Sequence, residues 1–498
     1  MTKVRVRFAP SPTGPLHIGG VRTALYNYLF AKKHGGDFLL RIEDTDQTRY
    51  VPGAEQYIMD ALDWLGLTTD EDPKRGGAYG PYRQSERKEI YIGYAMQLVQ
   101  EGKAYYAFDT SEELELMRAG SENDSFKYGV ETRMKMRNSE SLSKEETEAL
   151  VAIGDYAIRM KIPAGETISF EDEIRGHVAF ASDELDDKII LKADGMPTYH
   201  LANIVDDHLM EISHVIRGEE WLSSTAHHML LYRFFDWTPP SFSHLPLILK
   251  PTGQGKLSKR DGAKFGFPVF PLNWQDTEEA FPGFKEEGFM PQPLLNFLAL
   301  LGWSPGNDIE VMTMDQMITL FDLHKIVKGG AKFDIDKARW FNQQYIISMP
   351  SAEIAQMILP QASALGFTTD TDKLALCAHM MKERVGKIED ILNDAYYLFE
   401  KPKEYDNGTW EKKYKPENKA HFEAIAAKIS ESADQSREHL EMLVKSYISD
   451  HAIKMGEILP ILRIALTGTM QGPDLFDTMT FLGGTESGER IVFALNNI

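Results

Sequence analysis

The spacing of apolar positions over the first 65 residues switches between two periods, which predicts strands alternating with helices. Residues 3–9 alternate polar and apolar side chains and are expected to form a strand, and residues 37–43 a second one. Helices are predicted at residues 20–33 and 52–65, the second with a proline at its start. The buried face of the second helix would carry Ile58, Ala61, Leu62 and Leu65. This order is typical of a parallel sheet built from crossover units, so we expect an α/β fold.

The pattern between residues 88 and 195 is different and predicts an insertion of mixed helix and strand. A polar segment at residues 121–146 separates two kinds of stretch. Before it we expect helices over 88–101 and 111–118, and after it strands over 156–163 and 188–193. The sheet is expected to resume near 214–216, and the later helices are predicted at 220–235, 352–365, 373–397 and 420–429. From about residue 335 the chain therefore reads as mainly helical.

These shifts predict a multidomain chain, as its length of 498 residues also suggests. The predicted parts are a split sheet domain over residues 1–90 and 196–245, an inserted α+β domain over 91–195, a linking domain over 246–334, and a helical region over 335–498 that divides near residue 400.

Composition excludes several classes of protein. Apolar content of 43% and charged content of 26% are ordinary for a globular chain. No apolar run approaches the ~18 residues that span a bilayer, and the N-terminus lacks the apolar core of a signal peptide. The single Cys377 excludes an intramolecular disulfide and fits a reducing compartment. We therefore expect a cytoplasmic location and no membrane partner. With a net charge of −21, any RNA surface must be a local patch, for example residues 401–419.

Two short strings describe a candidate nucleotide site. FAPSPTGPLHIGG at residues 8–20 joins a predicted strand to a predicted helix, an arrangement that presents backbone N–H groups and a positive dipole to phosphates. KLSKRDG at residues 256–262 adds three cationic side chains suited to phosphate oxygens, and glycines flank it as they would flank a mobile loop.

Together these strings resemble the HIGH and KMSKS signatures of class I aminoacyl-tRNA synthetases. Further strings narrow the resemblance to the bacterial glutamyl-tRNA synthetase type: RIEDTD (41–46), YVPGAEQYIMDALDWLGL (50–67), GPYRQSER (80–87), YHLANIVDDHLM (199–210) and VIRGEEWL (215–222). The resemblance is dense over residues 1–340 and thinner beyond. It implies a Rossmann-like catalytic domain, an inserted connective or acceptor-binding domain, a linking domain that carries the KMSKS loop, and helical anticodon-binding domains.

The resemblance also implies an activity. A glutamate–tRNA ligase converts L-glutamate and ATP to glutamyl-adenylate and diphosphate, and then transfers glutamate to the 3′ end of tRNA(Glu). The expected catalytic residues are His17 and Lys259. The expected ATP-binding residues are Gly14, His17, Gly19, Gly20, Glu220, Lys256, Lys259 and Arg260. Gly20 occupies the place of the second histidine of the HIGH pattern, which removes one donor from the site.

A glutamate pocket needs two carboxylate-binding groups and one acid for the ammonium. Arg7 and Arg217 can each bind a carboxylate with two hydrogen bonds, and we favour Arg7 for the side-chain carboxylate. By resemblance the full set is Arg7, Ser11, Glu43, Tyr199, Asn203 and Arg217. Because glutamine would leave a buried guanidinium unpaired, such a pocket discriminates against it.

The expected cofactor is Mg²⁺ bound with ATP. Some relatives hold zinc in the inserted domain, but this chain has neither Cys nor His between His34 and His177, so no zinc is expected. Asp206, Asp207 and His208 are interpreted as structural support rather than a metal site. The protein is expected to act as a monomer.

Alternatives remain at this stage. The chain could charge tRNA(Gln) as well as tRNA(Glu), or, less in keeping with its strings, be a glutaminyl-tRNA synthetase or a small-molecule nucleotidyltransferase. A paralogue that modifies a tRNA base lacks the helical C-terminal third present here. The sequence leaves open whether activation requires tRNA, which residues read the anticodon, and what residues 263–284 do.

Overall fold

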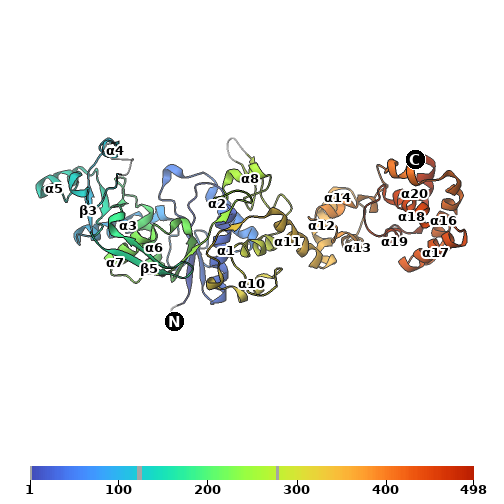
Figure 1. Ribbon diagram of the computed structural model, residues 1–498, viewed down its shortest axis with the longest axis horizontal. Helices are drawn as coiled ribbons and strands as arrows, with labels where there is room; N and C mark the ends of the chain where they lie inside the picture. The colour runs from blue at the N-terminus through green and yellow to red at the C-terminus, as the bar shows by residue number, and fades with distance from the viewer. Residues whose placement is uncertain (1–2, 120–125, 276–279) are drawn as a thin grey trace. The chain divides into compact units, whose positions relative to one another are not determined.

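The computed structural model describes residues 3–119, 126–275 and 280–498, and these form two compact units, Met1–Ile335 and Asp336–Ile498. The first unit contains the parallel sheet that the sequence predicts (Figure 1). Strands β1 (Arg5–Phe8) and β2 (Asp37–Leu40) pair in parallel, and helix α1 (Ile18–Lys33) connects them and packs on both. The α/β prediction is confirmed.

A second pair of parallel strands lies beside the first. Strands β8 (His214–Gly218) and β9 (Ser241–Leu245) pair in parallel, and β8 lies beside β1. The Ser213 N–H, just before β8, donates to the Arg5 carbonyl at 2.9 Å. The carboxyl ends of β1 and β8 therefore come together, which is where ligands bind in open α/β sheets.

Three predicted elements of this layer have different bounds. β2 ends at Leu40, so Glu43 follows the strand instead of ending it. Helix α2 (Ala54–Leu65) begins two residues after Pro52, although its predicted apolar face is buried as expected. The helix predicted over 220–235 is wrong as one element, because a 3-10 turn, Glu219–Trp221, precedes helix α7 (Thr225–Phe234). Two consecutive serines, Ser223 and Ser224, lie at the break, where their hydroxyls compete with helical backbone bonding.

The inserted segment contributes to two sheets. Its own sheet has three antiparallel strands in the order β3 (Ala104–Ala107), β4 (Ala157–Met160), β7 (Ile189–Leu191). Its helices are α3 (Lys88–Gln100), α4 (Ser111–Ala119) and α5 (Lys144–Ile153). Residues 121–125 of the predicted polar segment lie outside the described residues.

An antiparallel hairpin that the sequence analysis missed joins the insertion to the catalytic sheet. It consists of β5 (Thr167–Asp172) and β6 (Gly176–Ala181), and the sheet order is β6-β5-β9-β8. β5 meets β9 in parallel where Asp172 pairs with Phe242. One apolar core runs from the insertion into the sheet domain, since Ile158 and Ile168 belong to the same buried cluster as Leu39 and Val215.

The rest of the first unit carries the lysine loop. Helix α6 (Tyr199–Leu209) precedes β8, and short elements follow β9. These are β10 (Ile248–Leu249), α8 (Lys259–Phe265), β11 (Trp274–Gln275), β12 (Ala280–Phe281), α9 (Pro291–Ala299), α10 (Met314–Leu320) and β13 (Ala331–Lys332). β13 pairs in parallel with β10.

The second unit is helical, as predicted, and its described residues contain no strand. Its helices are α11 (Ile335–Ser348, whose first residue belongs to the first unit), α12 (Ser351–Ala364), α13 (Thr371–Met381), α14 (Asp390–Asp394), α15 (Asn407–Lys413), α16 (Lys419–Glu431), α17 (Arg437–Asp450), α18 (Met455–Thr467), α19 (Leu475–Leu482) and α20 (Gly484–Asn497). The predicted continuous helix over 373–397 is wrong: α13 ends at Met381, and Gly386 lies in the break, where a helix interior is disfavoured.

Candidate active site

A cavity of about 570 Å³ opens at the carboxyl ends of β1 and β8 and collects most of the predicted site residues. Those that line it are Arg7, Ser11, His17, Gly19, Gly20, Glu43, Tyr199, Asn203, Arg217, Glu220, Lys256 and Lys259. Gly14 and Arg260 are not among the lining residues. Residues from the two distant strings therefore share one cleft.

His17 is the N-cap of α1 and has a defined tautomer. Its Nδ1 accepts the Gly19 N–H at 3.1 Å, so a neutral His17 carries its proton on Nε2. Burial, with the nearby charges of Lys256 and Lys259, lowers the pKa of His17 to about 4, which keeps the ring neutral. Nε2 is buried and has no partner among the described residues. His17 can thus offer one N–H to a ligand in the cavity.

Two glycines explain how the turn and the loop approach each other. Gly14 has φ +133°, and a Cβ placed on it would lie 2.6 Å from Lys259 Nζ. Lys259 therefore rests against the turn that contains His17. A Cβ on Gly20 would lie 2.6 Å from Leu16 Cδ1, so the Leu16 side chain fills the space that a larger residue would need. This packing accounts for glycine at the second histidine position of the pattern.

The lysine loop is tied to the opposite wall of the cavity. Lys256 Nζ donates to Glu220 Oε1 at 2.6 Å. Burial raises the pKa of Glu220, but the hydrogen bond and charge of Lys256 outweigh it, so the net direction is down. Within the same string, Ser258 and Asp261 form a capping box that begins α8 at Lys259. Glu220 and Trp221 reach the cavity from the 3-10 turn and not from a helix.

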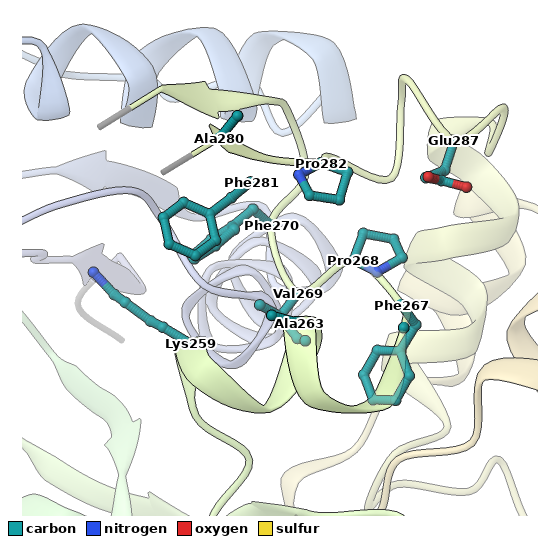
Figure 2. Close-up of a pocket in the computed structure, with 12 residues that line it drawn as sticks. Lys259, Ala263, Phe267, Pro268, Val269, Phe270, Ala280, Phe281, Pro282 and Glu287 are labelled. Atoms are coloured by element: carbon teal, nitrogen blue, oxygen red, sulfur yellow. The ribbon is translucent and has the colours of Figure 1, made fainter. Parts of the chain in front are cut away.

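Residues from 262–270 and 280–287 line a second, mostly apolar cavity of about 420 Å³ that shares Lys259 with the first. Figure 2 shows Phe270 and Phe281 side by side in its wall, with Lys259 leaving α8 at its edge; their ring centroids are 5.6 Å apart. The Phe270 ring also meets His17 edge-on at 6.1 Å, and Val269 O accepts the Ile18 N–H at 3.0 Å. Val269 and Phe270 therefore support the His17 turn from outside the cleft.

A buried ion network holds one side of the glutamate pocket. Arg7 donates from Nε and Nη2 to Asp207 at 2.9 and 3.1 Å. Arg41, which is fully buried, donates to Asp207 at 2.8 Å and to Glu43 at 2.9 Å. Asn203 Nδ2 also donates to Glu43 Oε1 at 2.9 Å. The positive charge of Arg7 is therefore already balanced by the Asp207 carboxylate.

Arg217 differs from Arg7, because its partners are neutral. It is 6% exposed and donates to Tyr199 Oη at 2.8 Å, Thr225 Oγ1 at 2.8 Å and His244 Nε2 at 3.1 Å. Within the described residues it makes no ion pair with an acid. A buried guanidinium without an anionic partner is unfavourable unless a ligand supplies one. The cavity thus presents an uncompensated positive charge on its Tyr199 side.

The side chains of Asp206, Asp207 and His208, which the sequence analysis interprets as structural support, all contact neighbouring side chains. Asp206 accepts hydrogen bonds from Arg87, Gln84 and Tyr91 at 2.8 to 2.9 Å. The His208 ring stacks on Trp237 with centroids 3.8 Å apart. Where the chain is described, no cluster of three His, Cys, Asp or Glu is placed to hold a metal. No helix in the described ranges is long and apolar enough to cross a bilayer.

Sequence reasoning missed four buried partners of the site: Arg41, Asp172, Thr225 and His244. Arg41 begins the string RIEDTD, two residues before Glu43. A charged residue directly after the apolar, buried residues of β2 was the signal that could have indicated a buried ion pair. The other three carry no local pattern, because their role depends on contacts made after folding: Thr225 and His244 contact Arg217, and Asp172 contacts His244.

The fold and the cavity define a class I aminoacyl-tRNA synthetase. A family model described as "tRNA synthetases class I (E and Q), catalytic domain" matches residues 3–340, and an "Anticodon binding domain" model matches residues 353–495. The chain is 51% identical to a glutamate–tRNA ligase of Phocaeicola vulgatus over 495 residues, with 98% of each chain covered, and 52% identical to one of Bacteroides fragilis over the same length and coverage. The chain belongs to the glutamate–tRNA ligase family.

Solved structures agree with this assignment. A glutamate tRNA ligase of Elizabethkingia meningosepticum in complex with its amino acid superposes with a TM-score of 0.96 at 48% identity, covering 99% of both chains. The synthetase of Elizabethkingia anophelis gives a TM-score of 0.92 at 48% identity, covering 99% of this chain and 100% of the other. The resemblance inferred from the two strings is confirmed, and so are the fold class and the class of enzyme.

Proposed function

We propose that this chain joins L-glutamate to tRNA(Glu) with ATP as the energy source, through glutamyl-adenylate. The observation that carries the proposal is the single cleft shared by His17, Lys259 and the uncompensated Arg217. One end of the cleft suits a triphosphate and the other an acidic amino acid. The activity agrees with the family of the chain.

The nucleotide end supplies cations and donors in place of a base. In the first step a glutamate carboxylate attacks the α-phosphorus of ATP and expels diphosphate, so negative charge builds on phosphoryl oxygens. Lys256, Lys259 and the Nε2–H of His17 can stabilise that charge. Mg²⁺ enters with ATP and shields its phosphates. On ATP binding, the Lys256–Glu220 hydrogen bond of 2.6 Å must exchange for phosphate or ribose contacts.

At the amino acid end of the cleft, Arg7 and Arg217 differ in whether an acidic side chain already pairs with them. In place of Arg7, which the sequence analysis favours, we assign Arg217 with Tyr199 to the side-chain carboxylate. Arg7 is already paired with Asp207 at 2.9 Å, whereas Arg217 donates to the neutral Tyr199 Oη at 2.8 Å. Arg7 lines the cavity and can bind the α-carboxylate. Glu43 uses Oε1 for Arg41 and Asn203, and its Oε2 accepts no hydrogen bond among the described residues, so it can receive the ammonium. Ser11 adds a hydroxyl to the cavity wall.

Glutamine should be a poor substrate for a physical reason. A neutral amide in place of the carboxylate would leave Arg217 buried with no anion, and an unpaired buried charge costs several kcal/mol. The same argument disfavours a glutaminyl enzyme as the alternative reading of the site.

The helical unit is proposed to bind the anticodon, in keeping with the domain model matched at residues 353–495. Single-stranded anticodon bases are read by stacking and edge contacts. The four-part domain division given above remains our proposal, and we propose a monomer that works in the cytoplasm.

The test is a charging assay with labelled glutamate, ATP and purified tRNA(Glu) or tRNA(Gln). Ester-linked glutamate should form on tRNA(Glu) only when ATP is present. Glutamine in place of glutamate is the matched control and should give at most about 1% of the efficiency, as loss of a buried charge pair predicts. Charging of tRNA(Gln) would show a non-discriminating enzyme, and absence of charging on any tRNA would overturn the proposal.

A further inference from the structure

Arg217 is held along one edge of its guanidinium by two neutral acceptors. Its Nε–H donates to His244 Nε2 at 3.1 Å, and Nη2 donates to Thr225 Oγ1 at 2.8 Å. Two other contacts are long, 3.5 Å from Nη1 to His228 Nδ1 and 3.4 Å from Nη2 to the Trp221 carbonyl. One N–H on each terminal nitrogen is therefore weakly satisfied, which is what a bidentate carboxylate requires.

Asp172 holds His244 from the side away from Arg217. Asp172 Oδ2 lies 2.6 Å from His244 Nδ1, and both side chains are fully buried. Asp172 also accepts the N–H groups of Ile174 and Arg175 at 3.0 and 2.8 Å, so its carboxylate is fixed. A carboxylate accepts only, so the His244 proton lies on Nδ1 and Nε2 remains the acceptor that Arg217 needs.

The charge states of His244 and Asp172 agree with these hydrogen bonds. Burial lowers the pKa of His244, against the opposing effect of Asp172, so the imidazole is neutral. Burial raises the pKa of Asp172, but the His244 and backbone hydrogen bonds outweigh it, so the carboxyl is ionised. The negative charge therefore stands one imidazole away from Arg217. Asp207, in contrast, contacts Arg7 directly and balances its charge.

We propose that Asp172 and His244 are positioning residues for the reaction, fixing the Arg217 guanidinium for the substrate carboxylate without neutralising it. The proposal rests on the function proposed above. It also gives a role to the hairpin β5–β6, because Asp172 ends β5 where that strand pairs with β9, the strand that carries His244. A neutral imidazole orients the cation, whereas a carboxylate in direct contact would compete with glutamate for it.

The test compares steady-state kinetics of charging for substitutions at His244. His244→Leu should raise the KM for glutamate ~10-fold or more while the KM for ATP changes less than ~2-fold, because only the amino acid end loses its alignment. His244→Gln should stay within ~3-fold of the natural protein, since an amide both donates to Asp172 and accepts from Arg217. Asp172→Asn should fall between the two. The double variant Asp172→Asn/His244→Leu should be no worse than His244→Leu, because Asp172 acts through His244.

The matched control is His227→Leu. His227 is 4% exposed on α7 and bonds the Asp186 carbonyl at 3.0 Å, but it does not contact Arg217. Its KM for glutamate should not change. Equal effects at His227 and His244, equal rises in the KM for ATP and for glutamate, or an unchanged KM for glutamate in His244→Leu would each overturn the positioning role. If His244→Leu does not fold, Asp172→Asn must exceed His244→Gln in its effect, or the proposal is wrong. A natural protein that charges no tRNA would instead overturn the function.

Discussion

The position of one proton on His17 decides whether the nucleotide turn can donate a hydrogen bond to phosphate. Burial and two lysines lower the pKa of His17 to about 4, so at pH 6 only about 1% of the ring is protonated. Nitrogen-detected NMR should therefore show the neutral Nε2–H tautomer from pH 5.5 to 8, with no titration in that range. The His17→Gln variant identifies the signal. An imidazole that titrates near pH 6.5 would contradict the burial argument.

Lys259 is expected to act on phosphates and not on tRNA binding. Lys259→Ala should lower the rate of adenylate formation ~10²-fold or more, the size of effect typical of losing a transition-state contact, and change the Kd for tRNA less than ~2-fold. Lys264→Ala is the matched control, since Lys264 is an exposed lysine of the same helix α8 that does not line the cavity. Diphosphate exchange at the natural rate in Lys259→Ala would refute the role.

The sequence predicted site residues that belong to a short local motif. It did not predict how residues far apart in the chain pair with one another. His17, Gly19 and Lys259 lie in short strings whose turn and loop chemistry is visible without a fold. Arg7 and Asp207 are 200 positions apart, and Asp172 and His244 are 72 apart. Nothing in the local pattern pairs them, so Arg7 looked like a free carboxylate binder before Asp207 was placed against it.

At the scale of elements, Arg41 joins the end of β2 to α6. Arg41→Met should destabilise the first unit by about 3–5 kcal/mol, because it leaves Asp207 and Glu43 buried with one cation fewer. Denaturant unfolding followed by circular dichroism measures this. Arg83→Met is the control: Arg83 pairs with Glu55 and Glu86 at 2.8 and 3.0 Å, but its side chain is 33% exposed, so the loss should be ~0–1 kcal/mol after solvent screening. Equal losses would show that burial does not decide the effect.

Elements with strong periodicity were predicted well, and elements held by tertiary contacts were not. α1 and α3 begin and end within two residues of the predicted bounds. The hairpin β5–β6 was missed although the burial of β5 alternates strictly, because the only large apolar residues of β5, Ile168 and Phe170, are separated by Ser169 and followed by two acids. The helix predicted over 220–235 begins only at Thr225, whose hydroxyl accepts a hydrogen bond from Arg217, and helix periodicity does not contain such a constraint.

At the scale of the whole molecule, the two units should fold separately. Asn342 on α11 donates to the Gly386 carbonyl at 2.8 Å, which links α11 to the break after α13 within the helical unit. The buried Arg490 satisfies the Tyr397 and Leu466 carbonyls at 2.6 and 2.9 Å, which ties the two halves of that unit together. A cut at residue 335 falls at the boundary between the two compact units. We expect cooperative melting for both fragments, 1–335 and 336–498.

The two fragments should divide the function as they divide the fold. Fragment 1–335 keeps the whole cleft, so glutamate with ATP should raise its Tm, as any ligand selective for the folded state does. It should charge tRNA(Glu) at least ~10²-fold less efficiently than the full chain, because it lacks the region matched by the anticodon-binding model. Loss of that region removes RNA contacts worth several kcal/mol. Fragment 336–498 should bind tRNA(Glu) without charging it, more weakly as salt rises, since any RNA contact on so acidic a chain depends on local lysines. Full charging by fragment 1–335 would mean that the first unit alone selects the tRNA.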